Sequence, residues 1–469
     1  MLFSSLVFIQ YFLPIVAFLY FAVRNLKVKN AVLLVGSIFF YAWGEPKYVI
    51  LMLISIGINY IFGLWMEKYE GRSLRRWLAA LCVLINLGLL GYFKYFNFFF
   101  RILGAVAGRE ILAPREIALP IGISFYTFQA LSYVLDVYRG QNRAQKNPWY
   151  LALYISFFPQ LIAGPIVKYH DIEAQIGQRT VSFQKAAYGV KRFTYGLAKK
   201  VILANTFAYV VDRVFGNAPN TLGTKLIWFT LVLYALQIYY DFSGYSDMAI
   251  GLGSMFGFRF MENFNYPYMS SSIREFWRRW HISLSTWFRE YLYIPLGGNR
   301  KGNLRTYVNL FVVFLATGLW HGAGANFVLW GVYYGVFIVA ERLFLGKWLD
   351  KNPIKILNHV YAMFVVLIGW LLFRIESLEQ IRALLSNMVH MRQGLYTVRM
   401  FADNRVFFLV AVGLVLCGPL QTMFGRVKSW LYDEERIRAV DVVIMAALLF
   451  LCVMLLVNNT YNPFIYFRF

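Results

Sequence analysis

Charged residues are scarce in this sequence, and acidic residues are the scarcest. Only 15% of its 469 residues are charged, 23 of them acidic and 46 basic, which gives a net charge of +23. Hydrophobic residues make up 59%, against roughly 45–50% in globular proteins. This composition argues against a water-soluble protein, in which such a positive charge would indicate nucleic-acid binding. In so apolar a chain it indicates basic cytoplasmic loops and contact with membrane lipid or an anionic substrate, and we expect no nucleic-acid partner.

Cysteine is nearly absent, and the common catalytic and nucleotide-binding motifs are missing. The three cysteines, Cys82, Cys417 and Cys452, lie in apolar runs without metal-ligand spacing. We therefore expect buried thiols, no disulfide framework and no metal site. The sequence contains no P-loop, HExxH motif, serine nucleophile elbow or dinucleotide-binding glycine motif. Hydrolase, ATPase and dinucleotide-dependent oxidoreductase functions therefore have no motif to support them.

Long hydrophobic runs dominate the chain instead. A helix of about 20 apolar residues crosses a bilayer and satisfies its own backbone groups. We expect an all-α integral membrane protein with about ten or more transmembrane helices, re-entrant and interfacial amphipathic helices, and a single membrane domain over residues 1–469. The clearest runs are 7–23, 48–66, 77–100, 226–240, 326–345, 361–373, 406–420 and 440–457, with shorter or proline-containing runs at 31–43, 149–167 and 307–320.

Basic loops predict the orientation of the chain. Arg24, Lys27 and Lys29 follow the first run, and a second basic group follows the third run at residues 68–76. Because cytoplasmic loops are enriched in Lys and Arg, both loops are predicted to be cytoplasmic and the N-terminus to lie outside. The first run has no basic segment before it and no cleavage site after it, so we expect a retained helix.

A first polar cluster ends the apolar run 226–240. Gln237 and Asp241 are four residues apart and would share one helix face, and Gly244 and Asp247 follow. Polar groups within a membrane are costly and are therefore functional candidates. They can equally bind neighbouring helices by hydrogen bonds, with Gly244 breaking the helix.

A second cluster lies in residues 273–295. Apolar residues recur there at spacings of three and four up to residue 291, which predicts one amphipathic helix. His281 falls on its apolar stripe, where a lone histidine is more often a core residue than a ligand. The opposite face carries Arg274, Arg278 and Arg289. That face could be solvated, touch lipid phosphate or receive the phosphates of a cytoplasmic donor.

A third cluster lies between two apolar runs, where His321 is followed by Gly322 and Gly324. The glycines predict a break in the helix, and Asn326 is predicted to cap the helix that follows. Irregular backbone at membrane depth is tolerated where it is buried or lines a cavity, so we expect His321 to face a cavity or tunnel. An imidazole that an apolar setting keeps neutral suits a general base acting on a hydroxyl. No role is assigned to His170, His359 or His390.

Four motifs, taken together and in order, resemble one enzyme family. They are PQLIAGP at residues 159–165, YYDFSGYSDMAIGLG at 239–253, EFWRRWHISLSTWFREYLYIPLGGNR at 275–300, and LWHG at 319–322 followed by LWG at 329–331. They resemble the membrane-bound O-acyltransferase (MBOAT) family, and within it most closely the branch of the alginate O-acetyltransferase membrane subunits. The resemblance covers most of residues 1–375, with its motifs mainly within 115–375, and the helices at 400–460 are less distinctive.

The resemblance implies a bowl of helices in which a cytoplasmic and an extracytoplasmic funnel meet at a narrow passage holding two histidines. By the motifs, His321 corresponds to the family's active-site histidine and His281 to the second one. One departure is the Gly-Ala-Asn segment at residues 324–326, where we expect an Asn-Trp type pair. This difference from the family pattern affects the expected shape of the site beside His321. Weaker candidates for contacts to the donor or acceptor are Arg278, Arg279, Asp241, Asn326 and Trp320.

The resemblance also implies a reaction. An acetyl group would pass from a cytoplasmic thioester, acetyl-CoA, to O-acetylate alginate or another exported or cell-wall polysaccharide, with no covalently bound cofactor. His321 would act as general base or carry the acetyl group itself. A bacterial inner-membrane location and an extracytoplasmic esterase-like partner, which would supply a Ser-His-Asp site, are further expectations. The alternatives are D-alanyl transfer to teichoic acid from a carrier-protein thioester, a transporter or polysaccharide-export channel, and a non-enzymatic scaffold.

Overall fold

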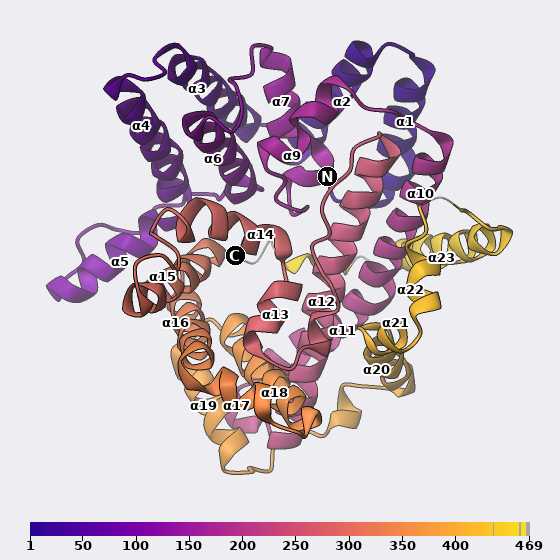
Figure 1. Cartoon of the computed structure of the whole chain (residues 1–469). Coiled ribbons are helices and arrows are strands. Elements are labelled where there is room, and N and C mark those ends of the chain that lie inside the picture. Colours follow the sequence, from indigo (N-terminus) through magenta and orange to yellow (C-terminus); the bar gives the residue numbers. More distant parts are fainter. Residues whose placement is uncertain (435, 459–460, 466–469) are drawn as a thin grey trace. The chain divides into compact units, whose positions relative to one another are not determined.

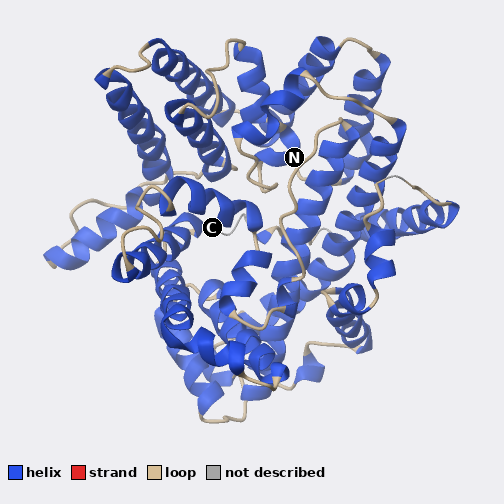
Figure 2. Ribbon diagram, in the orientation of Figure 1, coloured by secondary structure: helices blue, strands red, loops and turns tan. Residues whose placement is uncertain are grey.

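Helices make up all regular elements of the residues that the computed structural model describes, which are 1–434, 436–458 and 461–465. Figure 2 shows these helices joined by loops. The chain divides into two compact units. Unit 1 consists of Met1–Phe193 and Met248–Met261, and unit 2 of Thr194–Asp247 and Glu262–Phe469. The prediction of an all-α fold is therefore confirmed.

Unit 1 contains the helices of the N-terminal third of the chain, most of which are labelled in Figure 1. The α-helices are α1 (Leu13–Ala22), α2 (Leu26–Gly44), α3 (Tyr48–Lys68), α4 (Ser73–Leu90), α5 (Phe96–Ala107), α6 (Ile123–Arg139), α7 (Pro148–Ser156), α8 (Phe158–Leu161) and α9 (Tyr169–Gly177). Wider π-helical turns, η1 (Phe8–Phe12) and η2 (Gly91–Tyr95), lead into α1 and α5.

Two of the three boundaries between the units fall within α10 (Phe183–Ala198) and α12 (Thr224–Met255), and the third follows Met261 in the segment after α12. Unit 2 contains α11 (Asn205–Phe215), α13 (Ile273–Arg279), α14 (Ile282–Phe288), α15 (Asn303–His321), α16 (Ala325–Ala340), α17 (Gly346–Lys351), α18 (Lys355–Arg374), α19 (Leu378–Val389), α20 (Asn404–Leu416), α21 (Pro419–Met423), α22 (Gly425–Leu431) and α23 (Ala439–Asn458). Its short π- and 3-10-helical turns are η3 (Lys199–Ala204), η4 (Pro219–Thr221), η5 (Pro267–Met269), η6 (Arg289–Tyr293), η7 (Glu341–Leu345) and η8 (Val398–Met400).

Eight helical stretches among the described residues are long and apolar enough to cross a membrane. The predicted run 7–23 forms the shorter apolar helix Phe8–Ala22, whereas the run 31–43 extends into a helix of spanning length. Eight of the eleven predicted runs coincide with these stretches, whereas 7–23, 149–167 and 307–320 do not, so the prediction of about ten or more spans is higher than the eight found among the described residues. The eight are Leu26–Gly44, Tyr48–Lys68, Ser73–Ala107, Thr224–Met255, Ala325–Lys351, Lys355–Arg374, Asn404–Met423 and Ala439–Asn458.

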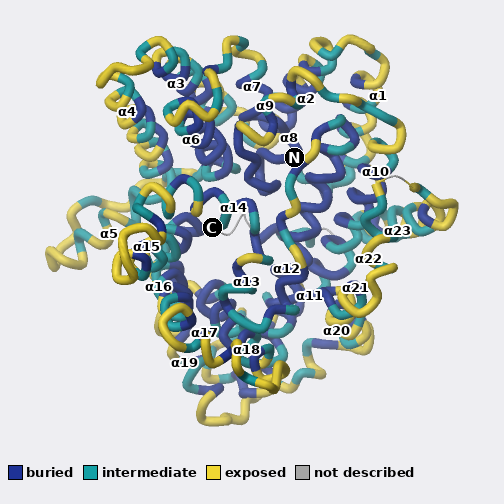
Figure 3. The backbone as a smooth tube through the Cα atoms, in the orientation of Figure 1, coloured by how far each residue is buried: buried dark blue, intermediate teal, exposed yellow. Residues whose placement is uncertain are grey.

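The longest helix, α12, carries the first polar cluster and is enclosed by protein. Its most apolar 18-residue window is 83% buried, whereas that of α23 is 11% buried, and Figure 3 draws α12 mostly in the dark blue of buried residues. The prediction that Gly244 breaks this helix is wrong, because α12 continues through it. A Cβ at Gly244 would lie 2.7 Å from the carbonyl oxygen of Gly196, so the glycine allows another helix to approach closely.

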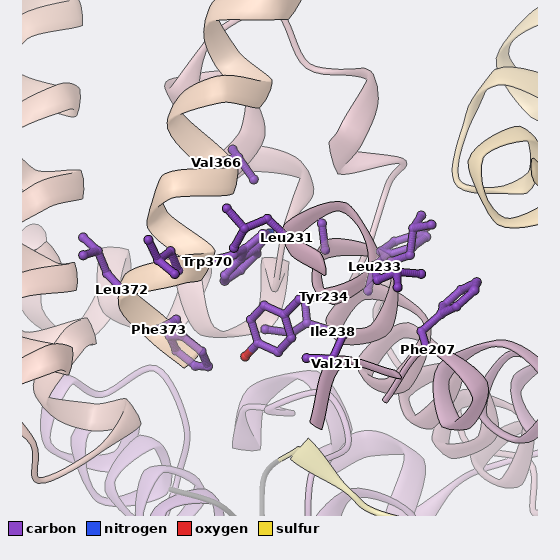
Figure 4. Close-up of a cluster of buried hydrophobic side chains, with 14 of the residues drawn as sticks. Phe207, Val211, Leu231, Leu233, Tyr234, Ile238, Val366, Trp370, Leu372 and Phe373 are labelled. Carbon is purple, nitrogen blue, oxygen red and sulfur yellow. The ribbon is translucent and has the colours of Figure 1, made fainter. Parts of the chain in front are cut away.

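The hydrophobic core of unit 2 is built around α12. Figure 4 shows Leu231, Tyr234 and Ile238 of α12 among buried side chains that include Val211 of α11 and Trp370 of α18. Each of these five side chains is at most 4% exposed. These apolar side chains pack closely and hold the helices of unit 2 together. They offer no hydrogen-bond partners, so the buried polar residues of α12 need partners elsewhere.

A histidine–carboxylate pair links two helices of unit 1. The Nδ1 atom of His170 on α9 lies 2.8 Å from Oδ2 of Asp136, which is buried on α6. This hydrogen bond raises the pKa of His170, and the charges of Asp136 and Asp171 act in the same direction, whereas burial and Lys168 lower it. The protonated imidazole is therefore the form that stabilises the α6–α9 contact.

We predict a pH-dependent contribution of His170 to stability. A group whose pKa is raised on folding stabilises fully below its unfolded pKa, and the contribution is lost as the pH rises through the folded value. His170→Gln should therefore lower the midpoint of thermal unfolding more at about pH 6 than at about pH 9. The measurement is thermal unfolding in detergent at both pH values. An equal loss at the two would contradict an ionic role for His170.

Candidate active site

His281 lies at a break between two short helices. The sequence predicts one amphipathic helix from 273 to 291, but α13 ends at Arg279 and α14 begins at Ile282, so that prediction is wrong. His281 adopts a left-handed backbone conformation with φ of +45°. The backbone N–H of Ile282 donates to the carbonyl oxygen of Asn263 at 3.0 Å. Hydrogen bonding to a residue distant in sequence thus replaces the helical bonds and holds the strained conformation, which is common at functional sites.

The side chain of Asn263 also determines which nitrogen of His281 carries the proton. Its Oδ1 accepts from the backbone N–H and the hydroxyl of Ser283, at 3.2 and 2.9 Å, while its Nδ2 donates to Oγ of Ser246 at 3.1 Å. Because a backbone N–H can only donate, the amide orientation is fixed. The Nδ1 atom of His281, 3.2 Å from the same Oδ1, must then carry the proton. This leaves Nε2 of neutral His281 as the acceptor, and Nε2 has no hydrogen-bond partner among the described residues.

The opposite end of α13 is anchored by a buried carboxylate. Glu341 accepts the backbone N–H groups of Ile273 at 2.6 Å and Arg274 at 2.9 Å. A carboxylate at a helix N-terminus satisfies unpaired N–H groups and complements the helix dipole. The short helix that leads to His281 is therefore fixed at both ends.

His321 is the last residue of α15, at the tip of the α15–α16 hairpin. The predicted break is confirmed, because Gly322 is extended and α16 begins at Ala325. The prediction that Asn326 caps α16 is wrong: Gly324 is the capping residue, and Nδ2 of Asn326 donates to the carbonyl oxygen of Leu372 at 3.4 Å. Asn326 is the second residue of the helix, two positions after the cap, and instead contacts α18.

Close packing of α15 against α16 places His321. A Cβ at Gly318 would overlap the carbonyl oxygen of Phe327, and one at Gly331 would lie 2.8 Å from the carbonyl oxygen of Phe314. Small residues let helix backbones approach within membranes. The two glycines therefore set the register in which His321 ends its helix.

The two histidines share an aromatic enclosure. The ring of Trp320 lies 6.0 Å from that of His281 and 5.0 Å from that of His321. Trp330 and Phe373 contact His321 at 5.2 and 5.1 Å. His281 and His321 are 1% and 7% exposed, and burial lowers the pKa of His281 well below its usual value, with the charge of His321 acting in the same direction. His281 is therefore neutral at physiological pH.

A cavity of about 260 Å³ opens beside His281. Three arginines line it, Arg274, Arg278 and Arg342, and Arg278 and Arg342 are exposed. Its other walls are largely apolar, formed by Trp277, Leu284, Phe288, Leu310, Val313, Phe314 and Ile338, with Ser285 and Thr317. A cavity with an apolar interior, a buried imidazole and a basic rim can hold a ligand that has a phosphate end and a less polar reactive end.

Two of the predicted site residues form ion pairs outside the cavity. Arg279 pairs with Glu275 at 2.8 Å and donates to the carbonyl oxygen of Asn265, and it does not line this cavity. Asp241 forms a buried ion pair with Lys200 at 2.6 Å, and its Oδ2 accepts the backbone N–H of Ile465 at 2.8 Å. Asp241 thus ties the C-terminal segment to α12.

Several residues of the site carry no local signal in the sequence. Asn263 lies in an irregular segment, and its role depends on meeting His281 eighteen residues later. Arg342 belongs to η7 and joins the cavity only because α16 packs beside α13. Arg274 is visible as part of the basic face, but sequence spacing alone does not separate it from Arg279.

Comparison with known proteins defines the family to which this protein belongs. Residues 138–382 match the model of MBOAT, the membrane-bound O-acyltransferase family, which is slightly more than half of the chain. The protein therefore belongs to the MBOAT family and is an acyltransferase embedded in a membrane, and the resemblance of its motifs is confirmed.

Similarity to individual proteins indicates which acyltransferases within the family the chain resembles. The chain is 46% identical to "Probable alginate O-acetylase AlgI" of Pseudomonas putida, over 81% of this chain and 78% of that protein. It is 36% identical to "Peptidoglycan O-acetyltransferase" of Helicobacter pylori, over 83% of this chain and 80% of that protein. A more distant relative, "Teichoic acid D-alanyltransferase" of Bacillus subtilis, is 28% identical over 55% of this chain and 70% of its own.

We predict that Gly318→Ala will disturb the hairpin that carries His321. The new methyl group would overlap the carbonyl oxygen of Phe327, and overpacking costs about 1–3 kcal/mol. Gly57→Ala is the matched control, because a Cβ there meets nothing within 4 Å. Thermal unfolding in detergent should show a lower midpoint for the first variant only, and equal midpoints would contradict the packing role of Gly318.

We also predict that Asp241 is a structural residue. Asp241→Asn leaves the buried ammonium of Lys200 without its carboxylate, and removing one partner of a buried pair costs about 3–5 kcal/mol. The double variant Lys200→Met with Asp241→Asn should recover much of that stability, because no charge is then buried. If the single and double variants unfolded alike, the ion pair would not be what Asp241 contributes.

Proposed function

We propose that the protein moves acetyl groups from a cytoplasmic thioester, acetyl-CoA, to hydroxyl groups of an extracytoplasmic polysaccharide such as alginate or a cell-wall glycan. It would do so in a bacterial inner membrane. The O-acetylation named for the Pseudomonas and Helicobacter relatives supports this substrate class. The observation that carries the proposal is the pair of buried imidazoles joined by Trp320, one of them lining a cavity with an arginine rim.

In this proposal His321 is the general base. Its imidazole takes the proton of an acceptor hydroxyl as the oxygen attacks the thioester carbonyl. The new carbon–oxygen bond forms, the carbon–sulfur bond breaks, and the proton passes to the departing thiolate. Enclosure by Trp320, Trp330 and Phe373 keeps competing water away from the thioester. In a variant of this mechanism the acetyl group rests on His321 before it reaches the acceptor.

His281 has a different role in the proposal. With Nδ1–H bound to Asn263, its Nε2 presents a lone pair and accepts a hydrogen bond. It is therefore suited to hold an amide N–H of the donor's arm, and not to donate a hydrogen bond to the carbonyl. Arg278 and Arg342, together with Arg274, would bind the donor's phosphates at the rim of the cavity.

An extracytoplasmic esterase-like partner completes the proposed pathway. The sequence contains no nucleophile elbow, and a partner with a Ser-His-Asp site would carry the acetyl group onward to the glycan. The alternative is D-alanyl transfer from a carrier-protein thioester; the name of the Bacillus relative supports the D-alanyl group. Release of free thiol from acetyl-CoA by the purified protein in lipid vesicles supports the first donor, and release only from a D-alanyl carrier protein supports the second.

We predict that His321→Ala lowers acetyl transfer or hydrolysis by about 10²- to 10⁴-fold, the usual contribution of a general base. His390→Ala is the matched control, because among the described residues that exposed histidine forms side-chain hydrogen bonds to Ser386 of the preceding helix and to no other residue. The measurement is thiol release from acetyl-CoA in vesicles. A wild-type rate in His321→Ala would contradict the proposal, and transport of substrate without thiol release would indicate a transporter.

We predict that Arg278→Gln combined with Arg342→Gln raises KM for acetyl-CoA about tenfold or more while changing kcat little, since charge-assisted hydrogen bonds to phosphate are lost. Acetyl-pantetheine lacks these phosphates, and its KM should not change. Arg279→Gln is the control, because Arg279 is paired with Glu275. An equal rise in KM for both donors would contradict phosphate binding at this rim.

A further inference from the structure

A second and larger cavity in unit 2 lies away from the histidines. Its volume is about 530 Å³, and its lining comes from η3, α11, η8, α20 and the end of α23. No residue of the His281 cavity belongs to this lining. The proposed acyl transfer therefore leaves this cavity without a function.

The cavity lies where candidate membrane spans end. Asn404 begins α20, and Asn458 ends α23, and the lining includes Asp403 and Arg405 from the first end and Leu456 and Asn458 from the second. Helices that span a bilayer end near its polar boundary. The cavity is therefore at the level of the lipid headgroups.

Three arginines supply most of the charge in the lining. Arg213, Arg399 and Arg405 are exposed, and Asp403 is the single carboxylate among the described residues of the lining. That carboxylate is engaged, because Oδ1 of Asp403 accepts the backbone N–H of Val406 at 2.9 Å. The guanidinium of Arg213 stacks over the ring of Phe401 at 5.4 Å, which orients it.

The rest of the lining is mixed: Asn205, Thr206, Tyr209, Asn458 and Tyr461 are polar, and the apolar part includes two leucines of the lipid-exposed helix α23. Val201 and Val210 contribute from η3 and α11, and Leu455 and Leu456 contribute from α23. Only 11% of the α23 window is buried within the protein, so the bilayer covers much of that helix. An arginine cluster that continues into a lipid-facing apolar wall matches an anionic headgroup with its acyl chains.

We infer that this cavity is a binding site for an anionic phospholipid. The phosphate of the headgroup contacts Arg213, Arg399 and Arg405, and the upper part of an acyl chain lies against Leu455 and Leu456. The occupant ties the adjoining segments η8 and the start of α20 to the end of α23, which is far from them in the sequence.

The experiment is native mass spectrometry of the full-length protein in detergent. Delipidated protein is mixed with phosphatidylglycerol, with phosphatidylcholine of the same acyl chains, or with soluble glycerol phosphate. The site should retain phosphatidylglycerol, and neither of the other two at the same concentration. Equal retention of both lipids, or equal binding of glycerol phosphate, would overturn the inference, because the first shows no charge selection and the second shows that no lipid chain is needed.

Variants locate the site. Replacing Arg213, Arg399 and Arg405 together by Gln should weaken retention about a hundredfold, at roughly fivefold for each basic residue near an anionic lipid. Replacing the same three by Lys keeps the charge and should preserve most of it. The control with equal charge loss is Arg382→Gln, Arg392→Gln and Arg426→Gln, at residues outside the cavity. Unchanged retention in the first variant, or an equal loss in the control, would overturn the site.

A fourth variant tests the apolar wall. Leu456→Trp keeps all three arginines and fills the space assigned to the acyl chain, so phosphatidylglycerol should be lost while the thermal midpoint stays near that of the unaltered protein. Undiminished retention in Leu456→Trp would show that a surface patch of charge suffices and would overturn a site with a chain-binding wall.

Discussion

The amide of Asn263 is the constraint on which the candidate site depends. One oxygen takes hydrogen bonds from the backbone and hydroxyl of Ser283 and from His281, while the backbone carbonyl of the same residue takes the N–H of Ile282. These bonds break a helix that would otherwise be continuous and fix the tautomer of the imidazole at the break. Without the hydrogen bonds of Asn263, residue 281 would lie within a continuous amphipathic helix, and neither ring nitrogen of His281 would be fixed as the acceptor.

Pairing with other residues lowers the cost of burying the polar groups around His281 in a membrane protein. Buried polar groups cost several kcal/mol unless they are paired, and two polar residues of α12 are paired with residues outside the helix: Asp241 with Lys200, and Ser246 with Asn263. The same helix thus packs the core through its apolar residues and supports His281 through Ser246. Ser246 therefore links α12 to the site in unit 2, and a change at this position of α12 reaches His281 through Asn263.

The sequence predicts those parts of this arrangement that depend on local patterns. Most apolar runs locate spans, the glycines after His321 predict the end of its helix, and the motifs single out both histidines, with Arg278 and Arg279 as equally weak candidates. What it does not predict depends on contacts between distant residues. The break at His281 depends on hydrogen bonds to Asn263. Gly244 does not end α12, because its role is to allow Gly196 of another helix to approach. Arg342 reaches the cavity through helix packing. Asn326 shows the reverse case, since a good capping residue stands two positions after the actual cap.

The most direct test of this account is the protonation state of His281 in the intact protein in lipid. Nitrogen-15 spectra of histidine-labelled protein, assigned with His281→Gln, distinguish an imidazole with Nδ1–H from one with Nε2–H and from the doubly protonated ring. The account predicts a neutral Nδ1–H ring for His281 that remains neutral well below the usual histidine pKa of about 6.5, and loss of that signature in Asn263→Ala. A His281 that carries its proton on Nε2, or that becomes charged near that ordinary pKa, would contradict it.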